Sequence, residues 1–122
     1  MTARISILYV DDEEALRILV PNQLNMEGFV VDTADDGDTA VEMLGKKTYD
    51  VVLLDIRMPR MNGIDVLRYV REHNLGSRVI MLTAVDDLTV AMEAVKNGAN
   101  DYLTKPYDIG TLVACIKRVV TL

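Results

Sequence analysis

The chain has 122 residues, of which 50% are hydrophobic and 26% are charged, and its formal net charge at pH 7 is -6. This length suits one compact domain with a real core, and the acidic excess argues against a general nucleic-acid binder. Cys115 is the single cysteine, so an internal disulfide is impossible, which fits a reducing, cytoplasmic setting. The apolar runs are too short to cross a bilayer, and the N-terminal run leads into acids, unlike a secretory signal. We therefore expect one domain over residues 1–122, with neither a membrane span nor an output domain.

Short apolar runs alternate with stretches of helical spacing along the whole chain. The runs are mostly rich in Val and Ile, as buried strands are, and they cover residues 5–10, 29–31, 51–54, 79–82 and, more weakly, 102–103. The helical stripes are Leu16, Val20 and Leu24; Ala40, Val41 and Leu44; Leu67 and Val70; Leu88, Met92 and Val95; and Leu112, Ile116 and Val119. This alternation predicts an α/β fold, with five parallel strands in one sheet, right-handed crossovers and helices on both faces.

Two glycines and one proline indicate where the predicted helices end or bend. Gly28 and Gly98 follow the first and fourth stripes, where a helix commonly ends in a left-handed residue. Pro21 lies inside the first stripe, where it removes a backbone donor at a cost of about 3 kcal/mol in a regular helix. We expect helix ends at both glycines and a kink or break near Val20.

Polar side chains follow four of the five apolar runs. Ligands of such a sheet bind beyond the carboxyl ends of its strands, so these side chains are the first candidates for a functional site. In chain order they are Asp11 and Asp12, Asp55, Thr83, and Lys105. We expect three carboxylates, one hydroxyl and one ammonium to converge on one edge of the domain.

Three crowded carboxylates repel one another and raise one another's pKa values unless a cation joins them. Oxygen ligands suit a hard ion, and a small open site suits Mg²⁺, which keeps several of its waters. In a purely structural alternative, Asp11 and Asp12 only cap the first helix. We expect one of them to act as a cap, but capping would not explain why Asp55 and Lys105 end other strands. The sequence thus predicts a Mg²⁺ site.

The segments that carry these residues read ILYVDDEE, LLDIRMPRMNG, VIMLTA and GANDYLTKP. In this order and at this spacing, they resemble the receiver domains of two-component response regulators, including the single-domain chemotaxis regulator. The resemblance extends over essentially the whole chain. It implies a flavodoxin-like (βα)5 fold with the strand order 2-1-3-4-5.

The resemblance also implies a role for each residue of the acidic site. Asp55 would accept a phosphoryl group from a sensor histidine kinase, a phosphotransfer protein or a small phosphodonor. Asp12 would bind Mg²⁺ directly, Asp11 would bind it largely through water, and the backbone carbonyl of Arg57 would be a further ligand. Lys105 would pair with the phosphoryl oxygens, since catalysis of phosphoryl transfer rests on positioning and on charge stabilisation.

A conformational switch follows from the same resemblance. Thr83 would donate a hydrogen bond to the phosphoryl group, and Tyr102 would turn inward as Thr83 moves; the alternative for Tyr102 is a half-buried tyrosine on an edge strand. Pro106 resembles the cis proline of the family. The face that changes would comprise residues 86–97, 101–103 and 108–120. It would contact a downstream effector or a covalently linked output domain, or mediate a homodimer, without itself binding nucleic acid or a membrane.

Two other functions fit the same architecture less well. A hydrolase similar to the haloacid dehalogenase-like phosphatases would need a second acid two residues after its aspartyl nucleophile, and that position holds Arg57. A flavin binder needs Gly, Ser and Thr donors in its first loop, which here reads DDEE. We therefore predict a phosphorylation-controlled regulatory domain, not an enzyme with an external substrate. Arg57 and Val85 occupy positions that influence the hydrolytic water in this family, and neither supplies a general base, so we predict slow dephosphorylation.

Overall fold

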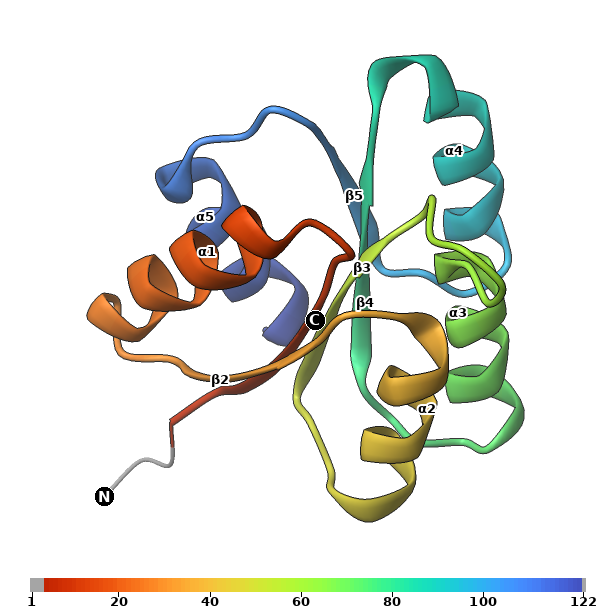
Figure 1. The fold of residues 1–122 in the computed structure, drawn as a ribbon, viewed down its shortest axis with the longest axis horizontal. Coiled ribbons are helices and arrows are strands. Elements are labelled where there is room, and N and C mark those ends of the chain that lie inside the picture. The colour runs from red at the N-terminus through yellow and green to blue at the C-terminus, as the bar shows by residue number, and fades with distance from the viewer. Residues whose placement is uncertain (1–3, 122) are drawn as a thin grey trace.

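The computed structural model describes residues 4–121 and contains one five-stranded sheet flanked by helices (Figure 1). Its strands are β1 (Ser6–Val10), β2 (Val30–Ala34), β3 (Val51–Asp55), β4 (Arg78–Thr83) and β5 (Asp101–Thr104). Its helices are α1 (Glu14–Met26), α2 (Gly37–Lys46), α3 (Gly63–Glu72), α4 (Leu88–Lys96) and α5 (Ile109–Val120), with a 3₁₀ turn at Val85–Asp87. All strand pairs are parallel, in the order β2-β1-β3-β4-β5. The predicted fold and strand order are confirmed.

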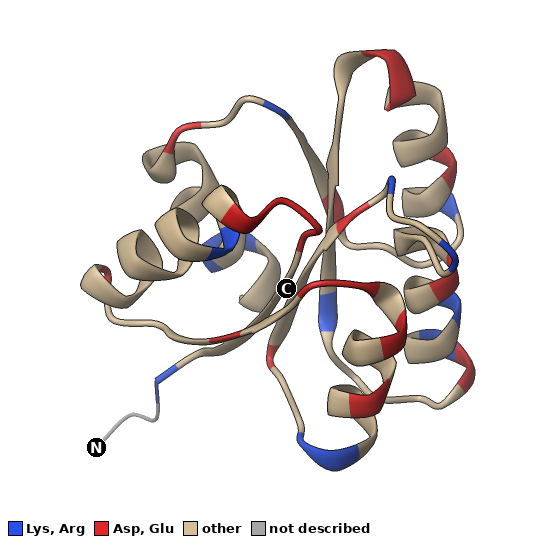
Figure 2. Ribbon diagram, viewed as in Figure 1, with Lys and Arg blue, Asp and Glu red and all other residues tan. Residues whose placement is uncertain are grey.

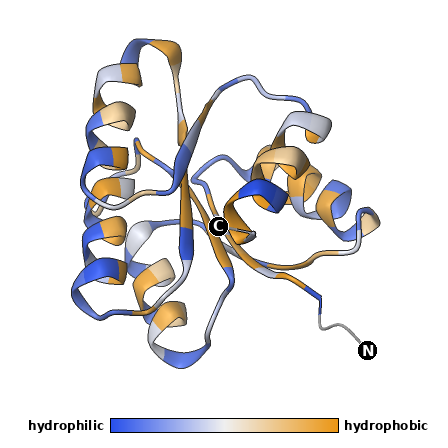
Figure 3. Cartoon of the chain, turned by 180° about the vertical axis from the view of Figure 1, so that it is seen from behind, coloured by the Kyte–Doolittle hydropathy of each residue, from blue (hydrophilic) through white to orange (hydrophobic). Residues whose placement is uncertain are grey.

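The sheet separates two hydrophobic cores. Helices α1 and α5 cover one face, and α2, α3 and α4 cover the other (Figure 1). Apolar residues follow the strands, while polar residues occupy the outer sides of α2 and α3 (Figure 3). The central strand β3 is buried along its whole length, as expected for a strand covered on both faces. Among residues 4–121, no helix combines the length and hydropathy that a membrane span requires.

The two predicted glycine helix ends are confirmed. Gly28 and Gly98 follow α1 and α4 with φ angles of 96° and 118°, which is backbone geometry that side chains rarely tolerate. Helices α2, α3 and α5 begin at side-chain caps from Asp36, Asn62 and Asp108. Each cap satisfies a backbone N–H that would otherwise lack a partner.

The predicted break at Pro21 is wrong. Helix α1 continues through this residue from Glu14 to Met26. Pro21 is buried together with Val20 and Leu24, and burying one such apolar side chain contributes about 1.5–3 kcal/mol. This packing outweighs the one backbone hydrogen bond that proline cannot make. The milder expectation of a kink stays a prediction.

The helix predicted from Leu88, Met92 and Val95 is present as α4, but this stripe does not form its buried face. The buried residues of this helix are Ala91 and Ala94, whereas the side chains of Met92 and Val95 are 51% and 36% exposed. Apolar residues occur on nearly every side of LTVAMEAVK, so their spacing does not identify the face that meets the sheet. Helix α4 therefore contacts the sheet through small residues and presents larger apolar ones to solvent.

Candidate functional site

The carboxyl ends of β1 and β3 bring three acids together. One carboxylate oxygen each from Asp11, Asp12 and Asp55 lies within 4.8 Å of the other two. The loops that carry these acids form one acidic edge (Figure 2). A hollow of about 190 Å³ lies beside them, and its lining includes Asp12, Asp55 and Lys105. The predicted convergence of the acids and the lysine is thus present in the structure.

Asp55 ends the central strand and is held from both sides. Strand β3 pairs with β1 and β4, and Asp55 lies opposite Leu82 of β4. The residue is only 7% exposed. Gly63 packs directly behind it, because a Cβ at Gly63 would lie 2.4 Å from the carbonyl oxygen of Asp55. Asn62 and Asp65 close a capping box at the same place, which fixes the start of α3 beside the acid.

The loop after Asp55 is held closely at a second glycine. A Cβ at Gly37, the first residue of α2, would lie 2.3 Å from the carbonyl oxygen of Met61. Arg60 joins the loop to the same helix start through ion pairs with Asp36 and Asp38. Residues 56–62 therefore lie between the starts of α2 and α3 with no room for further side-chain atoms at the two glycines.

Burial raises the pKa of Asp55 to about 7, against its usual value of 3.8. The ammonium of Lys105 works in the opposite direction, and the charges of Asp11 and Asp12 add to the rise. A cation among the three acids would favour the charged form of Asp55. A donor set made of carboxylate oxygens fits a hard divalent ion such as Mg²⁺.

Lys105 lies among the acids at the end of β5. Its Nζ is 3.0 Å from Asp11 Oδ2, 3.5 Å from Asp55 Oδ1 and 3.9 Å from Glu13 Oε1. Burial works to lower the pKa of this lysine, but its hydrogen bond to Asp11 and the nearby negative charges leave the pKa raised. The side chain therefore stays charged in the pocket. The peptide bond between Lys105 and Pro106 is cis, as the family resemblance implied.

The structure does not turn Thr83 into the acidic hollow. Thr83 ends β4 and is 1% exposed, but its hydroxyl donates to the carbonyl oxygen of Ala84 at 3.0 Å. Tyr102 is partly buried on the edge strand β5 and packs against the core beneath α2, α3 and α4. The switch roles of both residues stay predictions.

Side-chain capping of α1 by Asp11 or Asp12 is excluded. The first helical turn follows Glu13, which makes no side-chain capping bond. Asp11 instead accepts a hydrogen bond from the backbone N–H of Glu13 at 3.0 Å and is fully buried. The expectation that one of these two acids caps the helix is therefore wrong.

Sequence reasoning missed three contacts at the site. The hydroxyl of Tyr9 donates to Asp11 Oδ2 at 3.0 Å, and it lies 3.2 Å from the hydroxyl of Tyr107. Asp87 accepts two hydrogen bonds from the guanidinium of Arg57, at 2.8 and 2.6 Å, and these lower the pKa of Asp87. Tyr9 precedes Asp11 by two residues, so alternation along a strand placed both on one face. No local pattern identified Asp87.

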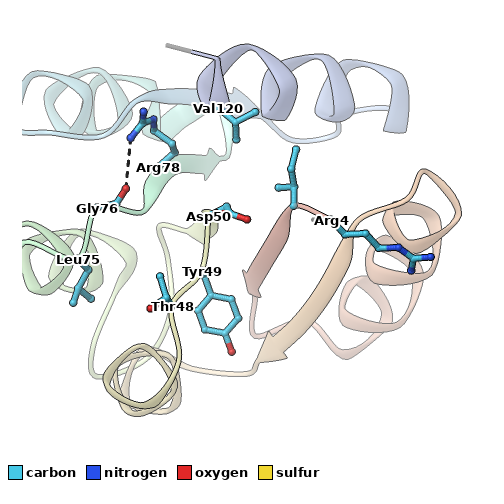
Figure 4. A pocket seen from close by; sticks show the side chains of 9 residues that line it. Arg4, Thr48, Tyr49, Asp50, Leu75, Gly76, Arg78 and Val120 are labelled. Atoms are coloured by element: carbon cyan, nitrogen blue, oxygen red, sulfur yellow. Dashed lines mark hydrogen bonds between the residues drawn. The ribbon is translucent and has the colours of Figure 1, made fainter. Parts of the chain in front are cut away.

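A larger hollow, of about 550 Å³, lies at the opposite end of the sheet (Figure 4). Its charged residues include Arg4, Asp50 and Arg78. Asp50 accepts hydrogen bonds from the backbone and hydroxyl of Ser6, and Arg78 donates to the carbonyl of Val119. These contacts support the fold, and no group of acids converges there. The acidic edge is therefore the candidate site.

Comparison with known proteins agrees with this geometry. Residues 7–117 match the family model for the response regulator receiver domain. The chain is 39% identical over 122 residues to the regulatory protein AtoC of Escherichia coli, covering 100% of this chain and 26% of that protein. It is 40% identical over 116 residues to the transcriptional regulatory protein TrcR of Mycobacterium tuberculosis, covering 95% and 45%. The chain thus spans less than half the length of these two relatives.

Solved structures give the same result. The chemotaxis protein CheY4 of Vibrio cholerae superposes with a TM-score of 0.89 at 32% identity, covering 96% of this chain and 99% of that one. The receiver domain of the Francisella response regulator 1452 superposes with a TM-score of 0.89 at 30% identity, covering 97% and 98%. The chain belongs to the response regulator receiver domain family, whose members are phosphoaspartate signalling switches of two-component systems.

Proposed function

We propose that Asp55 is the phosphoryl acceptor of this domain. The observation that carries the proposal is the meeting of Asp11, Asp12 and Asp55 within 4.8 Å, with the ammonium of Lys105 at 3.5 Å from Asp55. Asp55 is fixed on a buried strand, so its carboxylate is presented in one orientation. Lys105 would stabilise the negative charge that builds up on the transferred group. The domain would catalyse only its own phosphorylation and dephosphorylation.

Asp12, Asp11 and Asp55 would hold Mg²⁺, with the backbone carbonyl of Arg57 as a further ligand. When bound, the ion shields the carboxylates from an anionic phosphodonor. The direct test of the function is incubation with acetyl phosphate and Mg²⁺, followed by intact-mass measurement. One acid-stable, base-labile phosphoryl group is expected, and none when EDTA replaces Mg²⁺. A protein that stays unmodified under both conditions would contradict the proposal.

Replacing Asp11 or Asp12 is expected to reduce the affinity for Mg²⁺ to different extents. Asp12→Ala is expected to weaken Mg²⁺ binding more than Asp11→Ala, because of these two acids only Asp12 is proposed as a direct ligand, whereas Asp11 would bind the ion largely through water.

 Titration of the metal-free proteins with Mg²⁺, followed by tyrosine fluorescence, measures the affinities, since the chain has five tyrosines and no tryptophan. Equal affinity in the parent and both variants would refute the site.

The proposed switch predicts where the structure changes. Phosphorylation shifts a conformational equilibrium only by its difference in contact energy between the two states. Those contacts would come from Thr83 and Lys105, and Tyr102 would follow Thr83. Beryllofluoride, which stands in for the phosphoryl group, is expected to shift amide resonances over α4, β5 and α5. Shifts confined to the residues around Asp55 would contradict this switch.

The surface of α4 supports its assignment to the changing face. Its exposed apolar side chains include Met92 and Val95, and they would be covered by a downstream effector, a covalently linked output domain or a second copy of the chain. A sensor histidine kinase or phosphotransfer protein would supply the phosphoryl group. We propose a cytoplasmic location for the domain.

A further inference from the structure

Tyr9 carries a hydroxyl group into the hydrophobic core, where an aromatic ring alone would fill the space. The residue is fully buried in β1 and packs in the core beneath α1 and α5. Phenylalanine would fill almost the same volume without a polar atom that needs a partner. The hydroxyl finds that partner in Asp11, at 3.0 Å. Tyr9 thus contributes a hydrogen bond to one specific carboxylate of the acidic site.

Asp11 depends on three donors because it is fully buried. Its Oδ1 accepts from the backbone N–H of Glu13, and its Oδ2 accepts from both Tyr9 and Lys105, each at 3.0 Å. Lys105 is closer to Asp11 than to Asp55, from which it is 3.5 Å away. The ammonium proposed to serve Asp55 is therefore held by its neighbour. Taking a donor away from a buried carboxylate is costly unless another remains.

We propose that Tyr9 is a positioning residue that allows Lys105 to leave Asp11 and turn to the phosphoryl group on Asp55. The inference rests on the proposed phosphorylation of Asp55. When Lys105 turns away, Oδ2 of Asp11 keeps the hydroxyl of Tyr9 as a donor. Without that hydroxyl, the same oxygen would lose its last side-chain donor, so Asp11 would retain the lysine more strongly.

Tyr107 supports this arrangement from the loop that carries the lysine. A carboxylate oxygen only accepts hydrogen bonds, so the single hydroxyl proton of Tyr9 points to Asp11. The contact of 3.2 Å between the two tyrosines then has Tyr107 as donor and Tyr9 as acceptor. The order of donation is Tyr107, Tyr9, Asp11, and each bond polarises the next. Tyr107 lies two residues after Lys105, so this contact anchors the loop while the lysine side chain moves.

The first test compares phosphorylation rates at saturating Mg²⁺ with acetyl phosphate. Tyr9→Phe is expected to slow labelling roughly tenfold, the size that loss of one hydrogen bond to a charged group typically gives. Tyr49→Phe is the matched control, because Tyr49 is also buried and donates to a carboxylate, Asp32, away from the acidic site. It should label at the parent rate. An unchanged rate in Tyr9→Phe would overturn the inference.

The second test separates positioning from a structural effect. In the Lys105→Ala background, Tyr9→Phe should change the labelling rate by less than about twofold, because no lysine remains to be released. Equal slowing in both backgrounds would overturn the proposal. Urea unfolding of the metal-free proteins decides the question if Lys105→Ala labels too slowly to time. The free energy of unfolding should then fall further in the variant that combines Tyr9→Phe with Lys105→Ala than the sum of the two single losses. Simple addition of the two losses would count against Asp11 as their shared acceptor.

Failure of this inference is distinguishable from failure of the proposed function. If the parent protein does not label at all, the assignment of Asp55 fails. If the parent labels and Tyr9→Phe labels equally fast, only the role of Tyr9 fails.

Discussion

Replacing Asp55 with asparagine is expected to abolish the phosphoryl group that acetyl phosphate and Mg²⁺ add to the parent protein. The amide keeps the shape of the side chain but removes the anionic oxygen that would attack phosphorus. Intact-mass measurement after incubation gives the result directly. Asp50→Asn is a suitable control, because Asp50 immediately precedes the same strand at its opposite end. Normal labelling of Asp55→Asn would remove Asp55 from its proposed role.

The same variant should also change how stability depends on pH. The folded protein raises the pKa of Asp55 from 3.8 to about 7, so the folded state holds a proton that the unfolded state has released between these values. The stability from this proton is present below about pH 4 and is lost as the pH rises through about 7. At pH 8, metal-free Asp55→Asn should be about 2–4 kcal/mol more stable than the parent in urea unfolding, less the contribution of the lost Lys105 contact. Near pH 4 the two proteins should converge.

Slow loss of the phosphoryl group is the second large expected effect. In-line hydrolysis needs a positioned water, and neither Arg57 nor Val85 offers an acceptor for its proton. Asp87 holds the guanidinium of Arg57 beside the acidic hollow through two hydrogen bonds. The parent should therefore keep its phosphoryl group well beyond the time needed to remove the donor, and a separate phosphatase would be needed for fast reset.

Exchanging both residues tests this reading. Arg57→Asn combined with Val85→Glu should speed the loss by at least about tenfold, which is modest beside the roughly 10²–10⁴-fold that a positioned acid or base contributes. Arg60→Asn is the control, because Arg60 is another exposed arginine of the same loop but pairs with Asp36 and Asp38. Loss of the phosphoryl group within seconds in the parent, or no acceleration in the double variant, would show that the reading is wrong.

The sequence predicted the frame of the domain because its signals are local. The apolar runs and the glycines after α1 and α4 each act within a few residues, and strand-end polarity identified the convergence of Asp55 and Lys105. The break predicted at Pro21 was wrong because packing that forms only in the folded chain outweighs the lost backbone hydrogen bond. The orientation of α4 was missed because Met92 and Ala91 are both apolar and only contact with the sheet distinguishes them.

The parts of the site that sequence reasoning missed are contacts between distant elements. Tyr9 meets Tyr107 across 98 positions, and Arg57 meets Asp87 across 30. The residues next to Tyr9 or Arg57 in the sequence do not identify such a partner, because the order of the strands in the sheet brings the two residues together. Strand alternation put Tyr9 on the same face as Asp11, but only the structure identified its hydroxyl as a donor.

The two glycines beside the loop after β3 divide the acidic site into a stationary and a movable wall. Gly37 and Gly63 bring backbone against backbone at Met61 and Asp55, and close-packed main chain leaves no free volume into which this loop could slide. The opposite wall, residues 84–87, has no such close-packed glycine; Asp87 is bonded to Arg57, but Ala84 and Val85 are exposed there. A change at Asp55 is therefore expected to displace residues 84–87 and α4 more readily than α2 and α3, because the exposed Ala84 and Val85 have room to move.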